Sequence, residues 1–182
     1  MDKIKFDFLK WLKDETTNCT SVVEFGSMFF GVLSLIHETV KNRIGIEIHK
    51  PYIDKATFHN CIKIHGNMKN YRELVDKKYF DCALFVDSLE HLNEEEAIQL
   101  IESCKVDFNK IVLMIPEGLH PQTYDLMNMG AEEYQTHRSV WTLEKLQALN
   151  FNCVLDKHFH EFGDERDKNK NSGCLFCTWN KK

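Results

Sequence analysis

The sequence predicts an α/β fold, a single doubly wound and mostly parallel sheet with helices on both faces. Three features point to it. Short apolar runs rich in Val, Ile and Phe have the length of buried strands, stretches with helical end signals or periodicity separate them, and the last part of the chain departs from this alternation. Regular alternation of strands and helices is typical of a parallel sheet covered on both faces.

Five of the apolar runs are too short for typical helices and are interpreted as buried strands. In chain order they are Ser21–Phe25, Arg43–Ile48, Cys61–His65, Phe80–Asp87 and Lys110–Ile115. Two longer segments repeat apolar residues at helical spacing and predict amphipathic helices. The apolar faces are Ile4, Phe8, Trp11 and Leu12 in residues 2–14, and Phe29, Leu33, Ile36 and Val40 in residues 28–41.

End signals mark further helices. Pro51 suits the first position of a short helix through Ala56, and Asn93 precedes three glutamates that favour a helix start. Thr142 caps a helix over 143–149, and Asn150 tolerates the left-handed conformation that ends it. A further short helix is predicted over Tyr71–Lys77.

The end of the chain breaks the alternation. Asn152–His160 and Gly173–Trp179 have strand character, and the charged, Asn-rich segment Phe162–Ser172 between them shows no helical period. They predict an antiparallel hairpin at one edge of the sheet.

Length and composition favour one globular domain. The chain has 182 residues, of which 43% are hydrophobic and 28% charged. Within the single domain 1–182 we distinguish an N-terminal helix and loop at 1–20, a core at 21–116, an irregular segment at 117–141, and a last helix with the terminal hairpin at 142–182.

Charge and cysteine usage bound the partners and the compartment. The formal charge of −5 and the pI near 6.0 argue against a diffuse nucleic-acid binder and favour a small-molecule partner. The charged N-terminus predicts no secretory signal, and the longest near-apolar run, Phe29 to Ile36, is too short to cross a membrane. Seven scattered cysteines then indicate free thiols in a cytoplasmic protein. The sequence leaves the oligomeric state open.

Over about residues 20–155, several segments resemble those of the class I S-adenosylmethionine-dependent methyltransferases and follow one another in the order expected for that family. Phe80 to Leu92, which is similar to the fourth strand of that family and the loop after it, is the most specific match. The other matching segments are Val22 to Gly26, Ile44 to Ile48, Ile111 to Gly118 and His137 to Phe151. The resemblance implies a seven-stranded sheet with a central first strand. It also implies methyl transfer from S-adenosylmethionine, with S-adenosylhomocysteine as product.

The expected cofactor site lies beyond the carboxyl ends of the strands, where strand order reverses. Glu47 at a strand end suits the ribose hydroxyls, Gly26 allows a tight turn, and a helix opening near Ser27 offers N–H groups to the methionine carboxylate. The cofactor-binding residues that the resemblance implies are Glu24, Gly26, Ser27, Glu47, Ile48, Asn67, Met68, Asp87 and Ser88.

His137 and His91 are the candidate catalytic residues, as general bases for an acceptor that carries a proton of high pKa. Residues 117–141 leave the fifth strand on the cofactor edge and are interpreted as a substrate lid, with Met127 and Met129 as adaptable contacts. No metal is expected. The Cys174 and Cys177 pair invites a zinc site, but strand alternation directs these two side chains to opposite faces.

The sequence departs from the family at the glycine turn, since Met28 and Phe30 stand where glycines are usual. Phe30 either flanks the core or overhangs the cofactor. The alternative hypothesis is therefore a methyltransferase-fold binding or regulatory protein that has lost catalysis. A third is another nucleotide-binding enzyme, although no Gly-x-x-x-x-Gly-Lys loop for an ATPase or GTPase is present.

Overall fold

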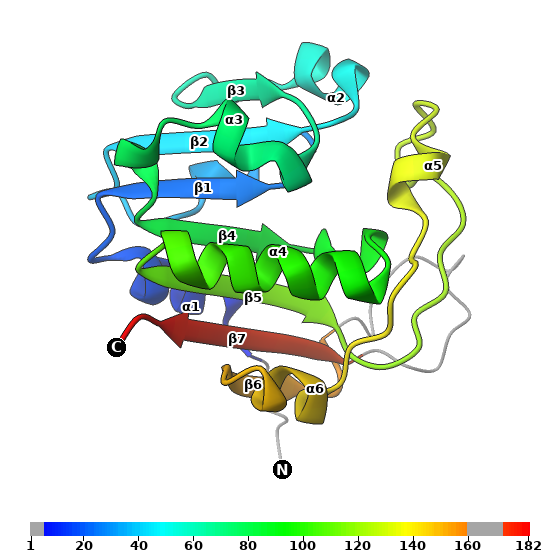
Figure 1. Cartoon of the computed structure of the whole chain (residues 1–182). Coiled ribbons are helices and arrows are strands. Elements are labelled where there is room, and N and C mark those ends of the chain that lie inside the picture. The colour runs from blue at the N-terminus through cyan, green and yellow to red at the C-terminus, as the bar shows by residue number, and fades with distance from the viewer. Residues whose placement is uncertain (1–5, 160–172) are drawn as a thin grey trace.

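The computed structural model describes residues 6–159 and 173–182 (Figure 1). Within them the strands are β1 Ser21–Phe25, β2 Asn42–Glu47, β3 Ile62–His65, β4 Cys82–Val86, β5 Lys110–Pro116, β6 Asn152–Asp156 and β7 Cys174–Asn180. The α-helices are α1 Phe8–Thr16, α2 Lys50–Lys55, α3 Tyr71–Leu74, α4 Glu94–Asp107, α5 Glu132–Gln135 and α6 Leu143–Ala148. Single 3₁₀ turns cover Val32–Ser34, Met68–Asn70, Lys77–Tyr79 and Leu89–His91.

The described strands form one seven-stranded sheet in the order β3-β2-β1-β4-β5-β7-β6. Strands β1 to β5 are parallel, and β7 is antiparallel to both of its neighbours, β5 and β6. The predicted α/β class, the mostly parallel sheet and the antiparallel terminal pair are confirmed. The first strand is interior, between β2 and β4, while β4 holds the middle position. The predicted link Phe162–Ser172 lies outside the described residues.

Several predicted helix ends are confirmed at the level of single bonds. The Asn93 side chain accepts the N–H of Glu96 at 3.0 Å, and the Thr142 hydroxyl accepts that of Lys145 at 3.3 Å. Asn150 has a φ of 59°. Pro51 is the second rather than the first residue of α2, and α3 ends three residues before the predicted Lys77.

The prediction of a helix over 28–41 is wrong, because the segment is irregular apart from the turn Val32–Ser34. Met28 and Phe30 have φ values of 47° and 61°, and two left-handed residues interrupt any right-handed helix. Leu33, Ile36 and Val40 are nevertheless buried. Their spacing therefore reflects burial against the sheet rather than helix formation.

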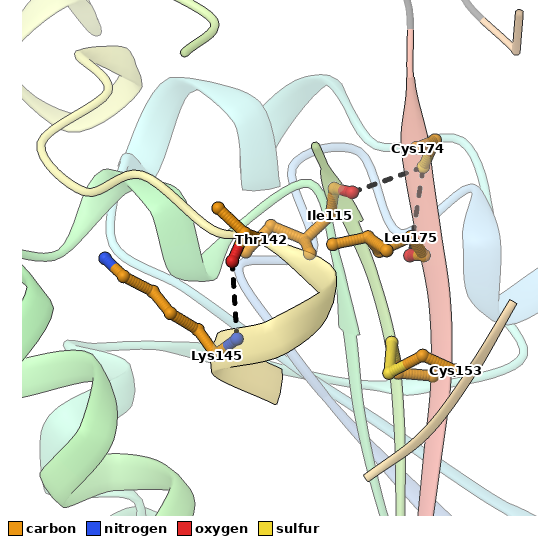
Figure 2. Close-up of a disulfide and its surroundings, with 7 residues drawn as sticks. Ile115, Thr142, Lys145, Cys153, Cys174 and Leu175 are labelled. Carbon is orange, nitrogen blue, oxygen red and sulfur yellow. Dashed lines mark hydrogen bonds between the residues drawn. A yellow bond between two sulfur atoms is a disulfide. The ribbon is translucent and has the colours of Figure 1, made fainter. Parts of the chain in front are cut away.

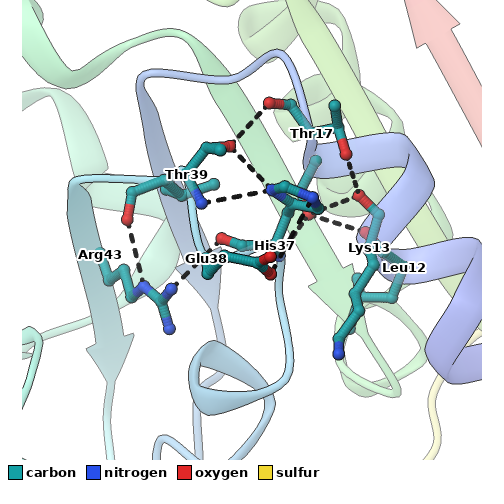
Figure 3. A network of polar contacts seen from close by, with 9 residues as sticks. Leu12, Lys13, Thr17, His37, Glu38, Thr39 and Arg43 are labelled. Carbon is teal, nitrogen blue, oxygen red and sulfur yellow. Dashed lines mark hydrogen bonds and ion pairs between the residues drawn. The ribbon is translucent and has the colours of Figure 1, made fainter.

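Side chains from neighbouring elements hold this irregular segment in place (Figure 3). Arg43 donates to the carbonyl of Leu33 at 2.8 Å. Arg43 also donates to the carbonyl of His37 at 3.2 Å, and the Thr39 hydroxyl donates to the carbonyl of Thr17 at 2.8 Å. The carbonyls of Leu33 and His37, which a helix would have paired internally, thus find a partner in β2, and the Thr39 side chain ties the segment to the residue after α1.

Both faces of the sheet are covered, with α4 over β4 and β5 on one side and α1 on the other (Figure 1). On the α4 side an aromatic cluster includes Phe25 and Phe85, stacked at 4.5 Å between ring centroids. On the opposite side Leu12 and Val22 pack with Phe30. Burial of β1 on both faces explains why Val22, Val23 and Phe25 are all apolar, with Glu24 as the one charged residue of the strand.

A disulfide joins β6 to β7 (Figure 2). Cys153 and Cys177 stand directly opposite in the antiparallel register, with 4.1 Å between their Cα atoms. The prediction that all the thiols are free is wrong for this pair, because the pairing depends on a register that the sequence does not show. Within the described residues, the free cysteines are Cys19, Cys61, Cys82, Cys104 and Cys174.

The alternation expected for the last strand is confirmed. Cys174 packs with Phe176 and Met114 on one face of the sheet, while Cys177 belongs to the core of the other face.

Among the helices of the described residues, none combines the length and the apolar character that a membrane span requires.

Candidate functional site

A cavity of about 280 Å³ opens at the carboxyl ends of the first four strands. It lies where strand order reverses between β1 and β4, the place at which open α/β sheets bind ligands. Its lining comprises Gly26, Ile46, Ile48, Gly66, Asn67, Met68, Lys69, His91, Leu92, Glu96, Glu133, Tyr134 and Arg138. Four of the predicted cofactor residues are in this set, as is the predicted catalytic His91.

Gly26 ends β1 and has a φ of 77°. A Cβ atom at this position would lie 2.8 Å from the Cβ of Ser88, in the loop after β4. Both the conformation and the close approach therefore require glycine. This contact brings the loops of the two strands together on one side of the cavity.

Glu47 ends β2 and is 6% exposed. One carboxylate oxygen accepts the N–H of Met28 and the other that of His49, both at 2.7 Å. Burial raises the pKa of Glu47, and these two bonds oppose the rise. Each oxygen keeps a second lone pair, so the carboxylate is fixed in orientation and still able to accept further hydrogen bonds.

The helix start that we predicted near Ser27 is not found in the turn after β1. Gly26 and Ser27 donate their N–H groups to the carbonyl of Ile46 at 2.9 and 3.0 Å, and the N–H of Phe30 goes to the carbonyl of Ser27 at 2.6 Å. No helix begins here, because the left-handed residues prevent it. The prediction of a helix N-terminus for the methionine carboxylate is wrong.

The Phe30 side chain lies in the core and does not overhang the cavity. It is fully buried beneath β2, where a Cβ atom on Gly45 would lie 2.4 Å from the Phe30 ring. Lys63 covers the same ring with its ammonium 5.5 Å from the centroid. Two residues at usual glycine positions, Met28 and Phe30, thus keep a left-handed backbone while the larger side chain points away from the cavity.

The remaining predicted cofactor residues divide into two groups. Asn67 and Met68 line the cavity, and the Asn67 side chain accepts the N–H of Lys69 at 3.0 Å. Glu24 and Ser88 are buried without lining it, and Asp87 is exposed with a φ of 46°. Burial raises the pKa of Glu24 to about 8.

The structure brings His91 and His137 together and adds Glu90 to them. One nitrogen or oxygen of each residue lies within 4.8 Å of the others. His137 reaches this position because Arg138 and Ser139 donate their N–H groups to the carbonyl of Glu90, at 2.7 and 3.1 Å. The irregular segment after β5 is thereby fastened to the turn after β4.

The orientation of these groups suits a metal ion or a proton-transfer role. His137 Nδ1 lies 2.6 Å from the carbonyl of His120, so it must donate, and Nε2 presents a lone pair 3.9 Å from Glu90 Oε1. Glu90 is 2% exposed, and among the described residues neither of its carboxylate oxygens has a hydrogen-bond partner. Burial raises the pKa of Glu90 well above its ordinary value, and burial together with His137 lowers that of His91 to about 4.

Several contributors to this site were not predicted from the sequence. Glu90 lies inside the most specific matching segment but is not among the predicted site residues. Glu133, Tyr134 and Arg138 line the cavity from the irregular segment. Only the return of the chain from β5 places them there, and no local pattern in the sequence reports it.

No protein-family model matches the sequence, and no curated protein is similar to it in sequence. Solved structures do match. The small RNA methyltransferase HEN1 superposes with a TM-score of 0.65 and 13% identity, over 99% of this chain and 27% of that one. The plantazolicin methyltransferase BamL, in complex with a triazolic desmethylPZN analog and SAH, gives 0.61 and 15%, over 96% and 82%. A SAM-dependent methyltransferase from Archaeoglobus fulgidus gives 0.59 and 16%, over 94% and 89%. At such identities the likeness confirms the fold of these methyltransferases.

Proposed function

We propose that this protein transfers a methyl group from S-adenosylmethionine to a small-molecule acceptor. The observation that carries the proposal is the cavity at the strand-order reversal, lined by Gly26, Ile48 and Asn67, which the Phe30 side chain leaves open. Solved methyltransferases of the same fold, some of them complexed with SAH or SAM, support it. The acidic net charge favours a small acceptor over RNA.

The proposed roles follow from the lining and from Glu47, which is not itself a lining residue but stands between the lining residues Ile46 and Ile48. The Glu47 carboxylate accepts hydrogen bonds from the ribose hydroxyls, because the amides of Met28 and His49 already fix its orientation. Ile48 and Met68 supply apolar contacts for the adenine, with Asn67 beside them. The sulfonium activates the methyl carbon. The protein's task is therefore to hold acceptor and cofactor in line and exclude water.

The Glu90–His91–His137 cluster forms the acceptor side of the proposed site. The buried Glu90 carboxylate, which has no hydrogen-bond partner among the described residues, and the imidazole nitrogens of His91 and His137 make a mixed oxygen and nitrogen donor set of the kind that divalent transition metals prefer. A bound cation would lower the pKa of an acceptor oxygen or nitrogen. The cluster itself would hold that atom beside the cavity that His91 lines. His91 and His137 thus serve as ligands in this proposal rather than as the general bases predicted from the sequence.

A matched pair of glycine variants tests the cofactor site. Gly26→Ala places a methyl group 2.8 Å from Ser88 at a positive φ, whereas Gly31→Ala meets nothing within 4 Å. We expect S-adenosylhomocysteine to raise the thermal stability of wild type and Gly31→Ala, and Gly26→Ala to lose most of this shift. Equal shifts in both variants would place the ligand elsewhere. No shift in the wild type would contradict the proposal itself.

A further inference from the structure

The irregular segment between β5 and α6 closes on itself and contains a buried carboxylate that the proposed reaction does not use. Gly118 donates its N–H to the carbonyl of Trp141 at 2.6 Å, which joins the two ends of the segment. Asp125, inside it, is 1% exposed. A carboxylate so deeply buried is costly unless hydrogen bonds satisfy it.

Four donors surround the Asp125 carboxylate. They are the N–H groups of Met127 at 2.9 Å, Met129 at 2.5 Å and Ala131 at 3.3 Å, and the hydroxyl of Tyr52. Although burial opposes the effect, the bonds from these donors lower the pKa of Asp125. The charged form therefore organises the chain from 125 to 131 around itself.

Tyr52 belongs to α2 and not to the irregular segment, so its hydrogen bond to Asp125 joins the segment to a distant part of the chain. Tyr52 is 1% exposed, and its ring packs against that of His49 with 4.7 Å between centroids. His49 Nε2 in turn lies 2.9 Å from the carbonyl of Met129. Two polar contacts thus tie the segment to His49 and Tyr52, two and five residues after Glu47.

Helix α5 follows this attachment and carries two residues of the cavity wall. The N–H of Tyr134 goes to the carbonyl of Ala131 at 2.9 Å, and the Tyr134 ring lies 6.0 Å from that of His49. Glu133 and Tyr134 both line the cavity. Figure 1 shows α5 beyond the carboxyl ends of the strands, on the side of the molecule where α2 lies.

We propose that Asp125 is a positioning residue for the cofactor, a role that rests on the proposed function. Through Tyr52 and the main chain of 127–131, it holds Glu133 and Tyr134 as the outer wall of the cavity. Asp125 does not itself line the cavity, so its effect passes through α5. The opposite end of the wall is fixed separately, where Arg138 donates to the carbonyl of His91 at 2.9 Å. Loss of the Asp125 attachment therefore loosens the wall at one end only.

The test compares Asp125→Asn and Tyr52→Phe with wild type in the full chain. The probes are S-adenosylhomocysteine in calorimetry, and S-adenosylmethionine turnover wherever an acceptor supports it. We expect each variant to bind S-adenosylhomocysteine at least about fivefold more weakly, and to raise KM for S-adenosylmethionine with kcat within about twofold, as loss of a positioning contact predicts. Asp76→Asn is the control. The Asp76 carboxylate accepts the N–H of Lys78, two residues on, at 3.0 Å, as Asp125 accepts that of Met127, but Asp76 does not belong to the segment that forms the cavity wall.

A double-variant cycle separates positioning from general stability. If Asp125 acts through α5, Tyr134→Ala also weakens S-adenosylhomocysteine binding, and Asp125→Asn adds little in the Tyr134→Ala background. Full additivity, or wild-type affinity in folded Asp125→Asn, overturns the inference while leaving the proposed function intact. Failure of the wild type to bind S-adenosylhomocysteine overturns both.

Discussion

Replacement of Glu24 by Gln should stabilise the protein, increasingly so as the pH rises. Glu24 is the fourth of the five residues of β1, is 2% exposed, and has an Oε2 atom without a hydrogen-bond partner in the described chain. Burial is the main cause that raises its pKa from 4.5 to about 8. The folded state therefore retains a proton that the unfolded state releases above pH 4.5.

The sign and size follow from this difference. A carboxyl group whose pKa is higher in the folded state costs stability as the pH rises from the unfolded towards the folded pKa. At about pH 7.5 the group is ionised in the unfolded state and mostly protonated in the folded state. This pH lies about three units above the unfolded pKa, and each unit costs about 1.4 kcal/mol, so the free energy of unfolding falls by roughly 4 kcal/mol. Solvent entry and local relaxation reduce this value, so it is an upper bound.

Urea unfolding between about pH 5 and pH 8 measures the effect. Wild type should lose stability across this range relative to Glu24→Gln, with the two proteins close to each other at the acid end. Glu73→Gln, at an exposed position of α3, is the control and should follow the wild type. Parallel curves for wild type and Glu24→Gln would refute the reasoning.

Three further predictions concern the turns and the two parts of the site. Asn150→Ala should cost about 1 kcal/mol in urea unfolding, because Asn150 has a φ of 59° and alanine tolerates that conformation less well; an unchanged midpoint would contradict the left-handed cap. His137→Ala should weaken Mn²⁺ binding at least about tenfold in calorimetry, while His59→Ala, at an exposed position, should not; equal Mn²⁺ affinity in the two variants would exclude the cluster as a metal site. Glu47→Gln should weaken S-adenosylhomocysteine binding by about 1.5–3 kcal/mol, the worth of hydrogen bonds to a charged group; wild-type affinity would remove Glu47 from the ribose.

Much of the sheet could be predicted because its strands are buried on both faces. Val22, Val23 and Phe25 form an apolar run whose strand character does not depend on which partner covers it. Helix starts such as Asn93 were also predictable, since capping is decided within a few residues. The helix prediction for segment 28–41 was wrong for the opposite reason. Its apolar period arose from burial against the sheet, while the left-handed Met28 and Phe30 controlled the backbone.

The site was predictable only where it follows directly from strand ends. Gly26 and Ile48 come directly after strands and Asn67 comes two residues after one, so a parallel sheet brings them to one edge. The partnering of Glu90 with His137, and of Asp125 with Tyr52, depends on how residues 117–141 return across that edge. Such contacts join residues far apart in sequence without a periodic pattern, and only the folded chain reveals them.

A crystal structure of the wild type with S-adenosylhomocysteine would test the proposed cofactor site directly. We expect the ligand in the cavity at the ends of β1 to β4, with its ribose hydroxyls within hydrogen-bond distance of Glu47. The adenine should lie beside Ile48, Asn67 and Met68, and Phe30 should remain buried beneath β2. An empty cavity at saturating ligand, or a ligand bound elsewhere on the molecule, would contradict the proposed site.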